Sequence, residues 1–124
     1  MPEIIKTNKN ILVIAGDVSA DVHGANLIKE LKNIDPELSI SSIGGQRMGA
    51  MSNHLIYDLV SHGTIGFLQT FKSLKLWIKL IALVRRYIEE KKPLCVIAID
   101  FYGFNHQVLG LCKHRGIPVF YYIP

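Results

Sequence analysis

Cysteine is scarce in this sequence, and long apolar runs are absent. Only two cysteines occur in 124 residues, Cys95 and Cys112, with neither a CxxC pair nor a zinc-binding spacing. This excludes a disulfide framework, and we expect both thiols to be free and buried in a reducing compartment. No stretch of about 18 uncharged apolar residues occurs, and the opening MPEIIKTNKN lacks the apolar core of a signal peptide. We therefore expect a cytoplasmic protein without a membrane-spanning helix.

Charge of one sign is not in large excess either. Lysine and arginine number 14 against 10 acidic residues, which gives a formal net charge of +4 and a pI of about 9.1. This net positive charge is too small to indicate nucleic-acid binding, but it fits a protein that binds anionic phosphates or an anionic membrane face. The hydrophobic fraction of 49% and the charged fraction of 19% favour a folded globule. The length fits one domain, residues 1–124.

Short apolar runs alternate with amphipathic segments, and no repeat or low-complexity tract interrupts them. Continuous apolar runs are typical of strands that are covered on both faces of a parallel sheet. We expect strands over Ile11–Ala15, Leu38–Ile43, Leu55–Leu59, Leu94–Ile99 and Ile117–Ile123. Helices are expected after the first strand as far as the break at Asn33–Pro36, over Gly66–Lys91 and over Asn105–His114.

This alternation predicts an α/β fold with a mostly parallel sheet and flanking helices. The sequence ends just after its last predicted strand, with no helix to close the layer. We therefore expect a domain that is truncated at its C-terminus, with an exposed sheet edge near Tyr121–Pro124 that favours association.

Three loops follow predicted strands and would lie at the carboxyl edge of the sheet, where open α/β sheets bind ligands. The first, GDVSADVHG, spans Gly16–Gly24 and opens a helix whose free N–H groups suit a phosphate or sugar hydroxyls. It lacks the GxGxxG spacing of a dinucleotide site. Ser19 or Asp21 would cap the helix. Capping, with His23 as a first-turn residue, explains the loop as well as ligand binding does, so both interpretations stay open.

The second loop, SIGGQRM, spans Ser42–Met48. Its pair Gly44-Gly45 would let the backbone approach a ligand closely, and the side chain of Arg47 could meet a phosphate. Glycine pairs are also ordinary turn residues, so we favour a plain strand-to-helix turn with a solvated arginine.

The third loop, IDFYGFN, spans Ile99–Asn105 and has Asp100 directly after an apolar strand. A carboxylate at this place in a cleft is well placed as a general base, and capping of the following helix explains it equally well. The five histidines are scattered through the chain. Because a metal site needs several ligands together, we expect four of them to be surface or packing residues: His54, His62, His106 and His114.

The longest amphipathic segment, Gly66–Lys91, combines a basic face with a widened apolar face. Between residues 72 and 92, seven basic residues oppose two acidic ones. Tryptophan together with lysine and arginine suits a membrane interface, whereas most amphipathic helices simply pack one side against a core. Both interpretations stay open, and the candidate membrane contacts are Lys72, Lys75, Trp77, Lys79 and Arg86.

Five ordered motifs resemble those of the lipid-A-disaccharide synthase family. GDVSADVHGANLIKEL resembles the family's GExSGDxHGAxLxxxL, and SIGGQRM resembles GIGGxxM. TIGF, residues 64–67, is similar to the MGF segment before the family's long helix. KPLCVIAIDFYGFN is similar to KPDxVIxIDxPDFN, and GIPVFYYIP matches the start of GIPxxxYxxPxxWAW. The resemblance covers nearly the whole chain from about Ile11 on, and several ordered motifs are far more specific than any one alone.

The resemblance implies the N-terminal, Rossmann-like half of a two-domain glycosyltransferase of GT-B architecture, acting in lipid A and hence lipopolysaccharide biosynthesis. The family transfers 2,3-diacylglucosamine from UDP-2,3-diacylglucosamine to 2,3-diacylglucosamine 1-phosphate, with inversion, release of UDP and no metal or other cofactor. The expected partners are these two substrates and the inner-membrane surface, with a peripheral location on its cytoplasmic face. The UDP-sugar site lies mainly in the C-terminal domain, so this domain or a partner chain would be required for activity.

The resemblance also implies roles for individual residues. Asp100 matches the family's catalytic carboxylate, which would activate the acceptor hydroxyl that attacks the anomeric carbon. Among the departures from the family pattern, Asp17 stands for the usual glutamate, Ala20 for a glycine and Gly103 for a second aspartate. The residues expected to bind substrate on the acceptor side are Asp17, Ser19, Asp21, His23, Gly24, Gly44, Gly45 and Asn105.

Other functions fit less of the sequence. A glycosyltransferase of lipid II synthesis would carry a GGTxGH-type first loop, which GDVSADVHG does not match. A receiver-type signalling domain needs an acidic pair after its first strand and a phospho-acceptor aspartate after a central strand, and the ordered motifs fit this pattern worse. A remnant domain that binds lipid or a partner without turnover stays open as an alternative, because the short length favours it.

Overall fold

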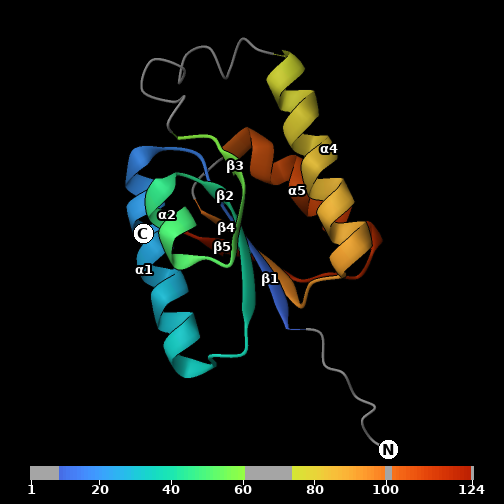
Figure 1. Cartoon of the computed structure of the whole chain (residues 1–124). Helices are drawn as coiled ribbons and strands as arrows, with labels where there is room; N and C mark the ends of the chain where they lie inside the picture. Colours follow the sequence, from blue (N-terminus) through green and yellow to red (C-terminus); the bar gives the residue numbers. More distant parts are fainter. Residues whose placement is uncertain (1–8, 61–73, 100–101, 124) are drawn as a thin grey trace, which may run out of the picture.

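The chain folds around a five-stranded sheet in which every neighbouring pair of strands is parallel (Figure 1). The structure, a computed structural model, describes residues 9–60, 74–99 and 102–123. The strand order is β3-β2-β1-β4-β5. In chain order the elements are β1 (Asn10–Ala15), α1 (Val18–Ile34), β2 (Ser39–Gly44), α2 (Gln46–Met51), β3 (His54–Asp58), α4 (Leu74–Lys91), β4 (Cys95–Ile99), α5 (Tyr102–His114) and β5 (Val119–Tyr122).

Helices cover both faces of the sheet, with α1 and α2 on one face and α4 and α5 on the other (Figure 1). Because side chains alternate along a strand, β1 supplies both cores. Leu12 and Ile14 pack with α4 and α5, whereas Val13 and Ala15 pack with α1. This burial from both sides explains the unbroken apolar sequence of β1, and it confirms the prediction of an α/β, Rossmann-like sheet with flanking helices.

The strand order reverses between β1 and β4, which are direct neighbours in the sheet. On one side of this point the strands follow one another outward in chain order, from β1 through β2 to β3. On the other side they follow from β4 to β5. The last residues of the two central strands, Ala15 and Ile99, are paired in register. In sheets of this kind the loops after the two central strands diverge and leave a crevice at their carboxyl ends.

Within the described residues, element boundaries agree with the sequence predictions to within a residue or so except in three places. The predicted helical residues 66–73, the TIGF segment and His62 lie outside the described residues. The prediction that Ser19 or Asp21 caps the first helix is wrong, because α1 begins at Val18 and the side chain of Asp17 accepts from the N–H of Ala20. Helix α5 begins at Tyr102, earlier than the predicted Asn105. Strand β5 is limited to Val119–Tyr122, within the longer apolar run that was predicted.

The two cysteines are free, as predicted. Cys112 of α5 is buried in the core that the sheet shares with α4 and α5, and burial raises the pKa of its thiol to about 11. Cys95 is only half-buried, so the prediction of a buried thiol is wrong for this residue, although its partial burial also raises the pKa of the thiol. Raised pKa values keep both groups in the unreactive thiol form at neutral pH.

Strand β5 lies at one edge of the sheet with large apolar side chains exposed. Phe120 is 59% exposed and Ile123 is 65% exposed, and Tyr121 and Tyr122 are also accessible. Apolar residues on an edge strand are a surface that another chain segment can cover. The predicted association through this edge stays a prediction.

Candidate active site

The first and third loops begin at the carboxyl ends of β1 and β4, where sheets of this kind have their ligand crevice. Strand β1 continues into Gly16-Asp17, and α1 starts at the next residue. Strand β4 ends at Ile99, so Asp100 follows it directly in sequence. Asp100 itself lies outside the described residues. The pairing of Ala15 with Ile99 makes the start points of the two loops neighbours.

Asp17 lies at the N-terminus of α1 with its side chain exposed. Its Oδ1 accepts a hydrogen bond of 2.8 Å from the N–H of Ala20. Because a carboxylate at this position offsets the partial positive charge of the helix end, the turn is a poor phosphate site and a better acceptor for sugar hydroxyls. Ser19 is exposed in the first turn of the same helix, so its hydroxyl is accessible from solvent.

Asp21, in contrast, is only 3% exposed and is fully occupied by backbone donors. Its carboxylate accepts hydrogen bonds from the N–H groups of Gly45 (2.8 Å), Met48 (3.1 Å) and Arg47 (3.3 Å). These donors belong to the N-terminal end of α2, so Asp21 caps a neighbouring helix rather than its own. The second loop is therefore a strand-to-helix turn, as favoured from the sequence, and the side chain of Arg47 is exposed.

Three of the candidate glycines have a packing reason to be glycine. A Cβ at Gly24 would lie 2.5 Å from Sδ of Met48, and one at Gly44 would lie 2.6 Å from the same atom. A Cβ at Gly45 would lie 2.5 Å from Oδ2 of Asp21. Contacts this short are not tolerated between these atom types, so close packing of α1, α2 and β2 explains these glycines without a ligand.

A ring contact between His23 of α1 and Tyr122 of β5 links the first helix to an edge strand of the sheet. Their ring centroids are 6.4 Å apart with an angle of 87° between the ring planes, an edge-to-face contact. His23 thus points across the carboxyl ends of the strands toward the end of β5. Tyr122 was not among the sequence candidates, and its only signal was an aromatic pair in the last apolar run.

Asn105 is buried near the N-terminus of α5, with 1% of its surface exposed. Neither its Oδ1 nor its Nδ2 has a hydrogen-bond partner among the residues that the structure describes. The neighbouring Phe104 is fully buried and packs edge-to-face on Trp77, with ring centroids 5.7 Å apart. Because an unpaired buried amide costs about 1–3 kcal/mol per group, Asn105 is an unusual residue for a purely structural position.

The predicted membrane contacts on α4 differ in what they touch. Lys75 is exposed, the Nζ of Lys79 lies 4.9 Å from the ring centroid of Tyr57, and Arg86 pairs with Glu90 at 3.3 Å. Trp77 is half-buried against Phe104. The cationic side chains are therefore on the solvent side of α4, while part of Trp77 belongs to the core. Lys72 lies outside the described residues.

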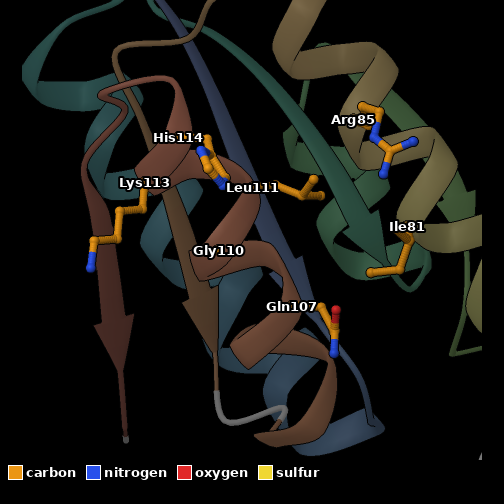
Figure 2. A pocket seen from close by; sticks show the side chains of 7 residues that line it. All are labelled: Ile81, Arg85, Gln107, Gly110, Leu111, Lys113 and His114. Atoms are coloured by element: carbon orange, nitrogen blue, oxygen red, sulfur yellow. The ribbon is translucent and has the colours of Figure 1, made fainter.

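A groove of about 670 Å³ lies between α4 and α5. Figure 2 shows Ile81 and Arg85 of α4 facing Gln107 and Leu111 of α5. Gly110 also lines the groove, and a Cβ at this position would have no atom within 4 Å. The remaining lining side chains are Lys113 and His114. None of the residues predicted from the sequence to bind substrate lines this groove.

Two further properties hold for the part of the chain that the structure describes. No three or more His, Cys, Asp or Glu side chains gather there closely enough to hold a metal ion. No helix in that part is both long enough and apolar enough to cross a lipid bilayer.

The parallel sheet, covered by helices on both faces and with its strand order reversed between β1 and β4, defines a Rossmann-like α/β domain. Residues 11–124 match the family described as lipid-A-disaccharide synthetase. The chain belongs to this family, which confirms the resemblance seen in the five motifs.

Individual relatives agree with this assignment. The chain is 34% identical to a lipid-A-disaccharide synthase of Geobacter metallireducens over 94% of its own length, and 34% identical to lipid-A-disaccharide synthase 1 of Legionella pneumophila over 91%. A Coxiella burnetii lipid-A-disaccharide synthase is 31% identical over 94% of the chain. The chain spans about 30% of the length of these relatives.

Among solved structures, the C-terminal domain of a Pyrococcus furiosus hydrogenase has the same fold. Its TM-score is 0.67 over 91% of this chain and 90% of that domain, at 18% sequence identity. At this identity the likeness extends to the arrangement of strands and helices alone.

Proposed function

We propose that the chain forms the acceptor-side, N-terminal domain of a glycosyltransferase of lipid A biosynthesis. The reaction joins 2,3-diacylglucosamine, carried by UDP, to 2,3-diacylglucosamine 1-phosphate, and UDP leaves. The observation that carries the proposal is the pairing of Ala15 with Ile99, because the first and third predicted loops follow these neighbouring strand ends. One of them contributes Asp17 and Ser19, and the other contributes Asp100.

In the proposed mechanism the carboxylate of Asp100 accepts the proton of an acceptor hydroxyl. The hydroxyl oxygen then attacks the anomeric carbon of the donor from the face opposite UDP, a new C–O bond forms, and the bond to the diphosphate breaks with inversion. General-base help of this kind contributes about 10²–10⁴ in rate. No metal or other cofactor takes part in the proposed reaction.

Asp17 and Ser19 would orient the acceptor sugar. The exposed carboxylate of Asp17 accepts hydrogen bonds from sugar hydroxyls, and the Ser19 hydroxyl donates or accepts. His23, held by its contact with Tyr122, would bound the same side of the crevice. The amide of Asn105, which has no hydrogen-bond partner among the described residues, would supply both a donor and an acceptor beside the start of α5.

The donor side of the reaction would come from outside these 124 residues. The relatives that match the chain are about three times as long, so most of their sequence has no counterpart here. A C-terminal domain, or a partner chain, would hold the UDP-sugar and close the crevice from the other side. We therefore propose that the 124-residue chain has little or no transferase activity alone.

The solvent face of α4 would meet the cytoplasmic face of the inner membrane. Lys75, Lys79 and Arg86 place positive charge there, and the apolar side chain of Ile78 is 59% exposed among them. Basic side chains around an exposed apolar residue suit an anionic lipid surface, where both substrates are anchored by their acyl chains. Charge reversal of Lys75 should weaken vesicle binding at low salt, and this effect should disappear at high salt.

One observation favours the alternative, a domain that binds a partner without turnover. Phe120 and Ile123 expose large apolar surfaces at the sheet edge, as a docking surface for another polypeptide would. A transfer assay separates this alternative from the enzyme, because a docking domain joined to a donor domain yields no disaccharide.

Acceptor binding by the chain tests the proposal directly. Titration of 2,3-diacylglucosamine 1-phosphate in micelles should shift the amide resonances of Ser19, His23 and Asn105, and empty micelles should not. Asp17→Ala and Ser19→Ala should each weaken the affinity by roughly three- to tenfold, the loss of one hydrogen bond. The matched control is Asp35→Ala, which removes a carboxylate at the opposite end of α1. Shifts confined to the solvent face of α4, with no change in the crevice, would refute an acceptor site.

A further inference from the structure

Asp21 joins two helices that follow different strands. It lies on α1, yet its buried carboxylate accepts the N–H groups of Gly45, Arg47 and Met48 at the beginning of α2. Helix α2 has no side-chain cap of its own at Gly45. Because the first N–H groups of a helix have no partner within it, Asp21 supplies the acceptors that α2 lacks.

Glycine and methionine pack this connection tightly. The side chain of Met48 is fully buried between Gly24 of α1 and Gly44 of β2, with no room for a Cβ at either position. Gly45 is equally restricted by the carboxylate of Asp21. We call this group, Asp21, Gly24, Gly44, Gly45 and Met48, the Asp21 junction.

A third segment is tied to the same place. The carbonyl oxygen of Gly44 accepts hydrogen bonds from the N–H groups of Leu59 (2.7 Å) and Val60 (3.1 Å), which follow β3. The Asp21 junction therefore connects the segments that follow β1, β2 and β3. All three leave the sheet at the edge where the crevice lies.

We propose that Asp21 is a positioning residue, whose carboxylate fixes these three segments as one rigid wall of the crevice and does not contact the acceptor. Asp17 and Ser19 lie within the first turn of the helix that Asp21 anchors, so their positions depend on the junction. A binding wall whose geometry is fixed in advance loses less entropy when the ligand binds. The functional part of this inference rests on the proposed acceptor site, whereas the mechanical coupling is a property of the chain itself.

Amide hydrogen exchange on the 124-residue chain tests the coupling. In Asp21→Ala we expect exchange at Gly45 and Met48 to become roughly tenfold faster, because their acceptor is lost. Ala20, Leu59 and Val60 should become about threefold faster, although their N–H groups donate to Asp17 or Gly44 and not to Asp21. Asp21→Asn keeps one carbonyl oxygen for Gly45 and Met48, so exchange should change less than about threefold.

The control is Asp35→Ala, which removes a carboxylate that accepts the N–H of Glu37 at the other end of α1. It should affect the amides near Glu37 and leave Ala20, Leu59 and Val60 unchanged. Faster exchange in Asp21→Ala that is confined to α2, or that extends uniformly into α4, would overturn the proposal. The first result means a local cap, and the second means a loss of global stability.

Affinity for 2,3-diacylglucosamine 1-phosphate separates positioning from direct contact. A positioning role predicts that Asp21→Asn binds within about threefold of the original chain and that Asp21→Ala binds roughly tenfold more weakly. Equal losses in both variants, with exchange unchanged in Asp21→Asn, would show a direct contact and overturn the proposal. If the unchanged chain binds no acceptor, the proposed function fails, and the exchange pattern still decides whether the junction couples the three segments.

Discussion

Replacement of Gly24 by alanine tests the packing of the Asp21 junction through the sign of a stability change. Alanine is favoured over glycine inside a helix by about 1 kcal/mol. Against this gain, the new Cβ would lie 2.5 Å from Sδ of Met48, 3.0 Å from its Cγ and 3.1 Å from its Cε. Met48 is fully buried and also lies close to Gly44, so its side chain can yield only by shifting within the core. Overpacking of this kind costs about 1–3 kcal/mol, so we expect a net loss of about 1 kcal/mol.

The effect of Gly24→Ala on the free energy of unfolding should change sign once Met48 is replaced by alanine. Met48→Ala alone should cost about 2–5 kcal/mol, because it opens a cavity in a fully buried position. In that background Gly24→Ala has no clash left and keeps the helix gain, so it should stabilise by about 1 kcal/mol. The coupling energy between the two sites is then about 2 kcal/mol, within the range known for contacting residues.

Urea denaturation of the four chains of this double-mutant cycle, followed by circular dichroism, measures the coupling. Gly110→Ala is the matched control, since Gly110 also lies inside a helix but its Cβ would meet nothing within 4 Å. It should stabilise the chain by about 0.5–1 kcal/mol in either background. A Gly24→Ala effect of the same sign with and without Met48 would refute the packing described for the junction.

Three further predictions concern single groups. Asp17→Ala should lower the free energy of unfolding by about 1 kcal/mol, because the N–H of Ala20 loses its acceptor, and Asp17→Asn should recover most of this in thermal melts. The hydrogen bond from Lys9 lowers the pKa of Asp35 below 3.8, so its contribution to stability is complete above that pH and is lost as the pH falls through the lowered pKa. As the pH is lowered from 6 to 2.5, the urea concentration at the midpoint of unfolding should therefore fall less steeply for Asp35→Asn than for the unchanged chain. Identical slopes for the two chains would contradict this ion pair. Because burial raises the pKa of Cys112 to about 11, iodoacetamide should leave it unmodified at pH 8 in the folded chain and modify it in guanidinium; rapid reaction in the folded chain would contradict its burial.

The sheet could be predicted from the sequence because its strands are buried on both faces. Continuous runs such as Ile11–Ala15 are incompatible with a half-exposed strand, and their alternation with helices leaves few topologies. The three loops at the carboxyl edge followed from the same pattern. Boundaries were less certain where several residues have equivalent capping ability, as with Asp17, Ser19 and Asp21.

The roles within the candidate site could not be predicted from local sequence, because they depend on contacts between distant segments. The acceptor role of Asp21 toward α2 requires α1 and α2 to pack side by side, which no local preference encodes. The contact between His23 and Tyr122 joins the first helix to the last strand. Burial of Asn105 is equally a tertiary property, because asparagine near a helix start is usually exposed.

The measurement that tests the central claim most directly is disaccharide formation by this chain joined to the C-terminal part of the Geobacter metallireducens relative. The substrates are UDP-2,3-diacylglucosamine and 2,3-diacylglucosamine 1-phosphate. We predict product and UDP from the joined protein, little or none from the 124-residue chain, and a loss of roughly 10²-fold or more in Asp100→Ala, with Asp35→Ala unaffected. Equal activity of the joined protein and its Asp100→Ala variant would contradict the proposed general base. If the joined protein still binds the acceptor in its crevice but forms no disaccharide, the proposed transferase function is contradicted.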